Sequence, residues 1–195
     1  MKDTKTEIFN AALTLFSEKS YHGASIRDIA KKIGKRESSI YNHFSSKEEI
    51  LTDIISNFSN RNFGKIILTD ELINQISKPE KFFSNLGMNL MGFWNSDKER
   101  MFIKILFYSN NIDSKEYEYS LSNYLDDFKK FTSIIFDEMI KHKYILKNDS
   151  KLLSNEFISF LFLHFIESLL QNKTNLEIKE FVKAHVAFFW NAIKR

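Results

Sequence analysis

Cysteine is absent from this sequence of 195 residues, proline occurs once and glycine occurs five times. The absence of cysteine excludes disulfides, thiolate nucleophiles and cysteine-ligated zinc. Sheet proteins need many tight turns rich in proline and glycine, so the scarcity of both residues favours an all-helical chain. Hydrophobic residues make up 43% and charged residues 27%, which is typical of a globular protein.

Long apolar runs are lacking as well. The longest, residues 157–166, contains His164 and is much shorter than the ~20 apolar residues that a membrane span needs. We therefore expect a buried helix there and no membrane partner. The first ten residues are polar and mixed in charge, unlike a signal peptide, which favours a cytoplasmic protein.

Motifs of catalysis and metal binding are also missing from the sequence. It has no glycine-rich phosphate loop and no nucleophile elbow, and its histidines show no metal-ligand spacing. A di-iron site on paired helices would need Glu-x-x-His motifs, and none occurs. We therefore predict a chain that is not an enzyme and that binds no cofactor or metal.

The N-terminal third has apolar residues at helical spacing. Those within residues 8–16 form one face of a helix that should end near Ser20. A short second helix is expected to start at Ser25, whose side chain can form a capping box with Asp28. It should end at Gly34, because glycine adopts the left-handed conformation of a helix end at little cost.

A third helix should run from about residue 36 to 42 or 43, with Ile40 and Phe44 pointing inward. A fourth should begin at Ser46, which can form a second capping box with Glu49. Two short helices that are joined by a glycine turn and supported by an earlier helix match a helix-turn-helix. The polar face of the third helix would then fit the major groove of DNA, where short side chains reach base edges.

Net charge is only +3, but the charge is unevenly distributed. Between Ser25 and Lys47 there are two anions and six cations. The cations are Arg27, Lys31, Lys32, Lys35, Arg36 and Lys47. A local basic segment is typical of a surface that meets nucleic acid, although a solvated helix face has the same composition.

The stretch SIRDIAKKIGKRESSIYNHFSSKEEIL resembles the N-terminal domain of the TetR family of regulators. It has a short helix ending in glycine, a small-hydrophobic-Tyr-x-His-Phe run, and Lys-Glu-Glu at the start of the fourth helix. The resemblance implies an all-α fold of about nine helices, with a three-helix helix-turn-helix domain at residues 1–60 and its motif at residues 25–44. Residues 61–195 would form a helical ligand-binding and dimerisation domain.

The same resemblance implies DNA contacts for ten residues: Ser25, Arg27, Arg36, Glu37, Ser38, Ser39, Tyr41, Asn42, His43 and Lys47. Residues 36–39 would read bases, whereas Tyr41, His43 and Lys47 would hold phosphates. Lys35 and Arg36 depart from the family pattern, in which a small aliphatic residue and a serine cap are common. We therefore expect Arg36 to contact DNA instead of capping the helix.

Phenylalanine is abundant, and most of its 20 residues lie beyond residue 57. A packed core explains most of them, and it is the default interpretation for any single one. The resemblance implies that some line an apolar pocket for a hydrophobic or aromatic effector. The candidates are Asn89, Phe93, Trp94, Phe102, Phe107, Tyr108, Tyr124, Phe128, Phe160 and His164.

The last two helices, expected near residues 151–171 and 176–194, are candidates for a subunit interface. The first is apolar all round, so a second subunit would cover the side that its own chain leaves open. The resemblance implies a homodimeric repressor that binds a palindromic DNA operator and is released by a small-molecule effector. The alternative is a helical adaptor that binds protein and no DNA.

Overall fold

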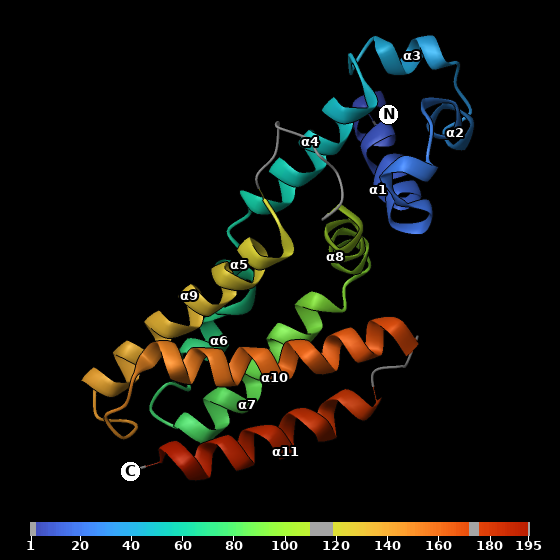
Figure 1. Cartoon of the computed structure of the whole chain (residues 1–195). Helices are drawn as coiled ribbons and strands as arrows, with labels where there is room; N and C mark the ends of the chain where they lie inside the picture. The colour runs from blue at the N-terminus through green and yellow to red at the C-terminus, as the bar shows by residue number, and fades with distance from the viewer. Residues whose placement is uncertain (1–2, 110–118, 172–175, 195) are drawn as a thin grey trace. The chain divides into compact units, whose positions relative to one another are not determined.

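The computed structural model describes residues 3–109, 119–171 and 176–194, and these residues form eleven helices and no strand (Figure 1). The helices are α1 (Thr4–Gly23), α2 (Ile26–Lys32), α3 (Glu37–Tyr41), α4 (Lys47–Ser59), α5 (Phe63–Ile67), α6 (Asp70–Ile73), α7 (Pro79–Trp94), α8 (Asp97–Ser109), α9 (Leu121–Lys141), α10 (Ser150–Gln171) and α11 (Leu176–Ile193). The predicted all-α fold is confirmed. The expected count of about nine omitted α5 and α6, two short helices in a segment without clear periodicity.

The chain divides into two compact units. Unit 1 contains residues up to Arg61 together with residues 97–124, and unit 2 contains residues 62–96 and 125 onward. Helix α8 belongs to unit 1 because it packs along α1, and Phe102 of α8 stacks on Phe58 of α4 with ring centroids 4.3 Å apart. The functional boundary predicted at residue 60 stays a prediction.

The signals that end and start the first helices act as the sequence predicts. Helix α1 loses helical geometry at Ser20, where φ is 62° and ψ is 168°. Ser25 and Asp28 form a reciprocal capping box at the start of α2, and Gly34 has a φ of 68° at its end. The capping box and the conformation of Gly34 therefore set where α2 begins and ends, and both involve only residues that are close in the sequence.

The second predicted capping box forms only in part. The Ser46 side chain accepts a hydrogen bond from the Glu49 backbone amide, at 3.1 Å, which caps α4. The Glu49 carboxylate does not complete the box, because it accepts hydrogen bonds from the backbone amide and the hydroxyl of Ser45. Those two bonds lower the pKa of Glu49.

A buried polar cluster lies in unit 1. The Glu99 carboxylate accepts a hydrogen bond from Arg61 Nη2 at 2.6 Å and another from the Tyr124 hydroxyl at 2.8 Å. Burial raises the pKa of Glu99, against the opposing effect of the Arg61 guanidinium. Glu99 stands three residues after Ser96, a spacing typical of a capping box, but its carboxylate accepts hydrogen bonds from Arg61 and Tyr124.

The core of unit 2 is built from closely packed aromatic rings. Phe83 of α7, Phe136 of α9, Phe157 of α10 and Phe189 of α11 contact one another with ring centroids 5.1–6.2 Å apart. Helix α7 approaches α11 closely at Gly87, where a Cβ atom would lie 2.9 Å from Val182 Cγ1. A larger residue at position 87 would therefore separate these helices.

Helix α10 is the one described helix that is long and apolar enough to cross a membrane, and half of its apolar window is buried inside the fold. Its buried residues include Phe157, Leu161 and Phe165, as expected for a core helix. Its other side is open, with Leu163 57% exposed. The prediction of a core helix is therefore correct for one face only.

Candidate nucleic-acid interface

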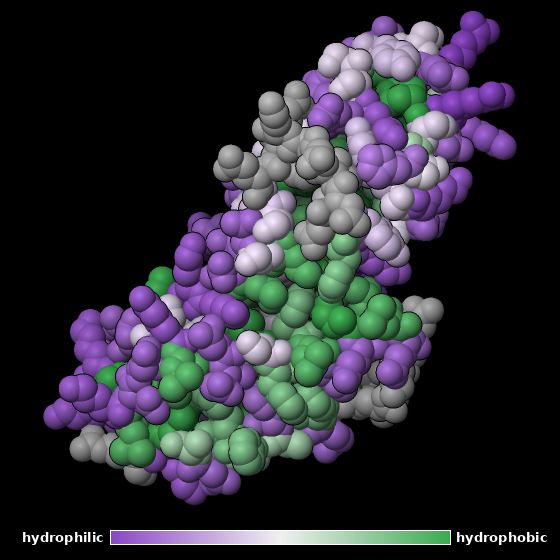
Figure 2. All heavy atoms as spheres, viewed as in Figure 1, coloured by the Kyte–Doolittle hydropathy of each residue, from purple (hydrophilic) through white to green (hydrophobic). Residues whose placement is uncertain are grey.

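Helix α3 presents a polar face to solvent from a fixed base. Ile40 is fully buried and Phe44 is 2% exposed, and together they anchor the helix to the rest of unit 1. Of the ten predicted contact residues, eight are exposed: Ser25, Arg27, Arg36, Glu37, Ser38, Tyr41, Asn42 and His43. Ser39 is half-buried. Figure 2 shows mainly hydrophilic atoms around this end of unit 1.

Arg36 and Tyr41 are the largest side chains on this face. Arg36 is the N-cap residue of α3, and its side chain makes no capping hydrogen bond, as the sequence predicted. Tyr41 is 54% exposed, so its ring extends well beyond the protein surface. Both side chains are long enough, and free enough, to reach a ligand that lies along α3.

Ser25 has a structural role that limits its use as a DNA contact. Its hydroxyl donates to Asp28 Oδ2 at 2.6 Å and accepts from the Asp28 amide at 3.1 Å. The hydrogen bonds from Ser25 lower the pKa of Asp28 and keep its carboxylate charged at the start of α2. A phosphate that approaches this helix end would meet the amides of α2 beside that negative charge.

Lys47 does not point into solvent. Its Nζ donates to the backbone carbonyls of Tyr21 at 2.8 Å and Ala24 at 2.9 Å, and it lies 4.2 Å from the centroid of the Tyr21 ring. Burial lowers the pKa of Lys47. The predicted phosphate contact of Lys47 stays a prediction, and the two carbonyls already occupy two of its three donor hydrogens.

The ten residues predicted to line a ligand pocket do not all lie together. Phe102, Phe107, Tyr108 and Tyr124 belong to unit 1, and the remaining six belong to unit 2. In unit 1, Phe102 and Tyr124 are core residues, whereas Tyr108 is 51% exposed. In unit 2, Phe93 and Trp94 both contact Phe128, and Trp94 Nε1 is buried without a hydrogen-bond partner among the described residues.

Asn89, Phe160 and His164 have other contacts in unit 2. Asn89 donates from its amide to the carbonyl of Ile67 at 2.9 Å, so part of its polar capacity is used inside the fold. His164 stacks on Phe181 with ring centroids 3.5 Å apart, and Phe160 stacks on Phe181 as well. The last two residues therefore belong to the contact between α10 and α11.

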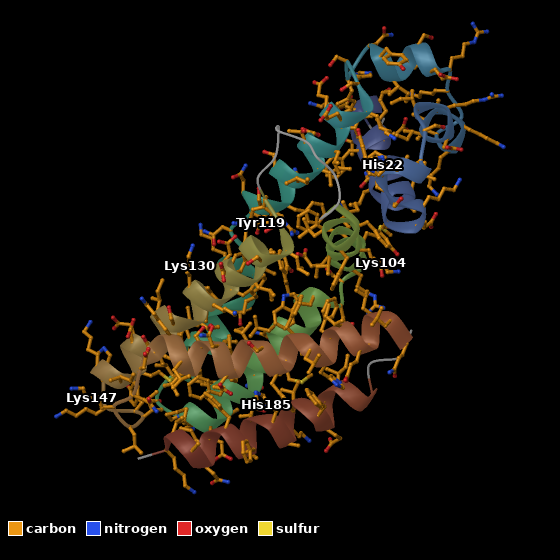
Figure 3. The ribbon with its side chains drawn as sticks, viewed as in Figure 1. His22, Lys104, Tyr119, Lys130, Lys147 and His185 are labelled. Atoms are coloured by element: carbon orange, nitrogen blue, oxygen red, sulfur yellow. The ribbon has the colours of Figure 1, made fainter. Side chains whose placement is uncertain are left out.

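The sequence did not predict a groove of about 360 Å³ between α10 and α11. Its lining residues are Glu156, Phe160, Phe181, Ala184, His185, Phe188 and Phe189. Phe188 is 80% exposed, and His185 Nε2 is buried without a partner among the described residues. Burial lowers the pKa of His185, which Figure 3 labels on α11, so its ring favours the neutral form. The signal that could have found the groove is an aromatic residue on the outer face of a terminal helix.

Comparison with known proteins matches the helix-turn-helix region. Residues 8–54 match the family model of bacterial regulatory proteins, tetR family. The chain is 39% identical over 61 residues to the HTH-type transcriptional repressor KstR2 of Rhodococcus jostii (strain RHA1), covering 31% of this chain and 30% of that protein. It is 41% identical over 56 residues to the biofilm operon icaADBC HTH-type negative transcriptional regulator IcaR of Staphylococcus epidermidis, covering 29% of this chain and 30% of that protein.

These alignments span less than a third of the length of either relative. The whole chain is similar in fold to the ketosteroid transcriptional regulator KstR2 of Mycobacterium tuberculosis, with a TM-score of 0.67 and 17% identity. That likeness covers 100% of this chain and 97% of the other. Sequence similarity is therefore concentrated in the helices around α3, whereas the likeness of fold extends over all the helices.

Proposed function

We propose that this chain is a dimeric transcriptional repressor of the TetR family, because residues 8–54 match the tetR family model and the whole chain has a similar fold to such a regulator. It would bind a palindromic DNA operator and leave it when a small hydrophobic or aromatic effector binds. Its relatives KstR2 and IcaR are transcriptional regulators, which supports DNA binding over catalysis. We expect it to act in the cytoplasm, where the operator lies.

The polar face of α3 is the observation that carries this proposal. Polar side chains at positions 38 and 42 and the carboxylate at position 37 flank the larger Arg36 and Tyr41, and Ile40 holds the helix in place from the buried side. An α-helix of this kind fits the major groove, where such side chains reach base edges and phosphates. A second copy would place its own α3 about one helical turn away, ~34–36 Å.

Binding to duplex DNA at several salt concentrations tests the proposal. Fluorescence anisotropy with a mixed-sequence duplex should show an affinity that falls steeply as salt rises, because phosphate contacts release counterions. Binding-site selection should then return a palindromic consensus. The alternative function, a helical adaptor for proteins, predicts no duplex binding at any salt concentration, so this measurement separates the two.

Replacing Tyr41 with alanine should weaken operator binding about 10-fold, since one well-placed contact contributes on the order of 1–3 kcal/mol. The ring is 54% exposed, so the folded state should lose little stability. Anisotropy titration measures the affinity, and thermal melting followed by circular dichroism serves as the control. An unchanged affinity would remove Tyr41 from the proposed interface.

Replacing Arg36 with alanine should change the base preference and leave the fold intact. The side chain makes no capping bond, so its removal leaves no structural bond unmade. Arginine is the commonest partner of guanine in the major groove, and its loss relaxes specificity at the base that it reads. Binding-site selection with the variant should lose information at one position in each half-site. A consensus identical to that of the wild type would contradict the base-reading role.

The dimer would form through α10 and α11. Phe160, Leu163, Leu170 and Phe188 on these two helices are 47–80% exposed, and Phe160 and Phe188 line the groove. Contiguous exposed apolar surface of this kind is typical of a protein contact. A two-fold axis would pair the groove with the same surface of a second copy.

The effector site is proposed within unit 2, around Phe93, Trp94 and Phe128. Trp94 is fully buried, and its indole Nε1–H has no acceptor among the described residues. A buried donor without a partner is rare and costly in a folded protein. An apolar effector with an oxygen acceptor would satisfy it. The regulator of similar fold from Mycobacterium tuberculosis is named for ketosteroids, and a ketosteroid is an apolar molecule with an oxygen acceptor.

A further inference from the structure

Two of the six cations of the helix-turn-helix, Lys35 and Lys47, are bound to groups of the protein itself. We infer that Lys35 and Lys47 are positioning residues that hold the helix-turn-helix in place, and that Arg27, Lys31, Lys32 and Arg36 carry its charge toward DNA. The inference rests on the proposed DNA binding, which it deepens. It differs from the sequence prediction, in which Lys47 holds a phosphate.

Lys47 joins the two ends of the helix-turn-helix segment. The segment follows Ala24 and finishes at Ser46, so a bond from the Lys47 ammonium to the Ala24 carbonyl closes it into a loop. The second bond, to the Tyr21 carbonyl, involves the last turn of α1, where carbonyls lack partners within the helix. The ammonium of a lysine at this place donates hydrogen bonds to carbonyls at the end of α1. Its positive charge also interacts favourably with the negative end of the α1 dipole.

The Tyr21 ring adds a third contact to the same ammonium. It lies 4.2 Å from Lys47 Nζ, within the range of a cation–π interaction, and its edge packs on Phe16 with ring centroids 5.5 Å apart. Phe16 is fully buried in α1. The chain of contacts from Phe16 through Tyr21 to Lys47 therefore links the start of α4 to the core.

Lys35 holds the turn between α2 and α3. Its Nζ donates to Thr4 Oγ1 at 2.6 Å and lies 3.2 Å from Glu7 Oε2, both on α1. The turn is thereby tied to the first turn of α1, 31 residues earlier in the chain. Because Glu7 neutralises this ammonium, Lys35 adds little to the charge that faces DNA. The family pattern of a small aliphatic residue at this position offers no such bond.

The other four cations remain open to solvent. Arg27, Lys31, Lys32 and Arg36 are all exposed, and the structure records no ion pair within 4 Å for any of them among residues 3–109. Figure 3 shows nitrogen-ended side chains extending outward from the region of α2 and α3. Counterion release from DNA depends on cations that touch phosphates, so this group should determine the salt dependence.

The salt dependence of binding separates the two groups of cations. The logarithm of the affinity falls with the logarithm of salt concentration at a slope of about −0.9 for each phosphate contact. Arg27→Met is the matched control, and in a dimer it should make the slope shallower by ~1.8, since it removes one contact from each subunit. Lys47→Met should leave the slope unchanged and weaken binding by a similar factor at every salt concentration. Lys35→Met should do the same.

The experiment uses the full chain and a mixed-sequence duplex of about three helical turns. A slope that becomes shallower in Lys47→Met as much as in Arg27→Met would overturn the inference. Lys47→Arg provides a second variant. Arginine is the stronger partner of phosphate, so unchanged or tighter binding supports a phosphate contact and contradicts positioning. Weaker binding supports positioning, because the larger guanidinium does not fit between two carbonyls and the Tyr21 ring.

A measurement without DNA keeps this test independent of the proposed function. Hydrogen–deuterium exchange should be faster across residues 25–46 in Lys47→Met than in the wild type, because the loop is no longer closed at its ends. Unchanged exchange there would overturn the positioning role. If the wild type binds no duplex at any salt concentration, the proposed function fails, and the exchange result alone decides the role of Lys47.

Discussion

Replacing Phe188 with aspartate is expected to convert the dimer into a monomer and thereby to weaken operator binding by at least about 100-fold. The ring is 80% exposed in the single chain, so the change costs the isolated fold little. In a two-fold interface it would act twice, placing two carboxylates in apolar surface. Loss of a central aromatic anchor alone contributes about 2 kcal/mol or more to an interface. A dimer holds both copies of α3 on one operator and so binds it more tightly than a single copy does. Dissociation into monomers removes this gain in affinity.

Sedimentation at micromolar protein measures the predicted change in mass. Ile134→Asp is the matched control, because Ile134 is 64% exposed and lies on α9, away from the proposed interface. The control should remain dimeric and bind DNA like the wild type. A Phe188→Asp variant that keeps the dimeric mass would show that the exposed face of α10 and α11 is not the subunit contact.

Features set by neighbouring residues could be predicted from the sequence. The Ser25–Asp28 capping box, the left-handed Gly34 and the break of α1 at Ser20 each depend on a few consecutive residues. Local patterns of hydrogen bonding and backbone conformation determine such features. The helix-turn-helix was therefore predicted with nearly its observed helix limits, apart from a shorter α3.

Contacts between distant residues could not be predicted in the same way. Lys35 and Lys47 look like DNA-binding cations in the sequence, yet their partners lie 31 and 23–26 residues away in the chain. Glu99 shows the same limit, because its position after Ser96 suggests a capping residue whereas its partners are Arg61 and Tyr124. A charged side chain has several partners within reach, and only the fold selects among them.

Helical periodicity likewise does not show what a buried face meets. The aromatic residues chosen for a ligand pocket all have helical spacing, but Phe102 and Tyr124 pack in unit 1 whereas Trp94 and Phe128 pack in unit 2. The apolar composition of α10 predicted cover on one side by its own chain and on the other by a second subunit, and one side is open in the single chain. That open side is what makes a second copy necessary in the proposed function.

Replacing Glu99 with alanine is expected to lower the free energy of unfolding by about 3 kcal/mol, the lower end of the range for breaking a buried ion pair. The Glu99 side chain is 1% exposed, and its loss leaves the Tyr124 hydroxyl buried without its acceptor. Arg61 is 29% exposed, so its guanidinium regains part of its hydration in the variant. The loss in the free energy of unfolding therefore stays at the lower end of that range. Thermal unfolding should therefore shift downward by roughly 6–12 °C.

Two further variants show whether the effect comes from burial. Glu138→Ala removes a carboxylate that is 48% exposed and pairs with Lys141 at 3.1 Å, and it should change the stability by less than about 0.5 kcal/mol. Tyr124→Phe should lose about 1 kcal/mol. Adding it to Glu99→Ala should cost less than the sum, because the two side chains share one hydrogen bond. Strict additivity, or an equal loss in Glu138→Ala, would mean that the cluster does not stabilise unit 1 through its buried bonds.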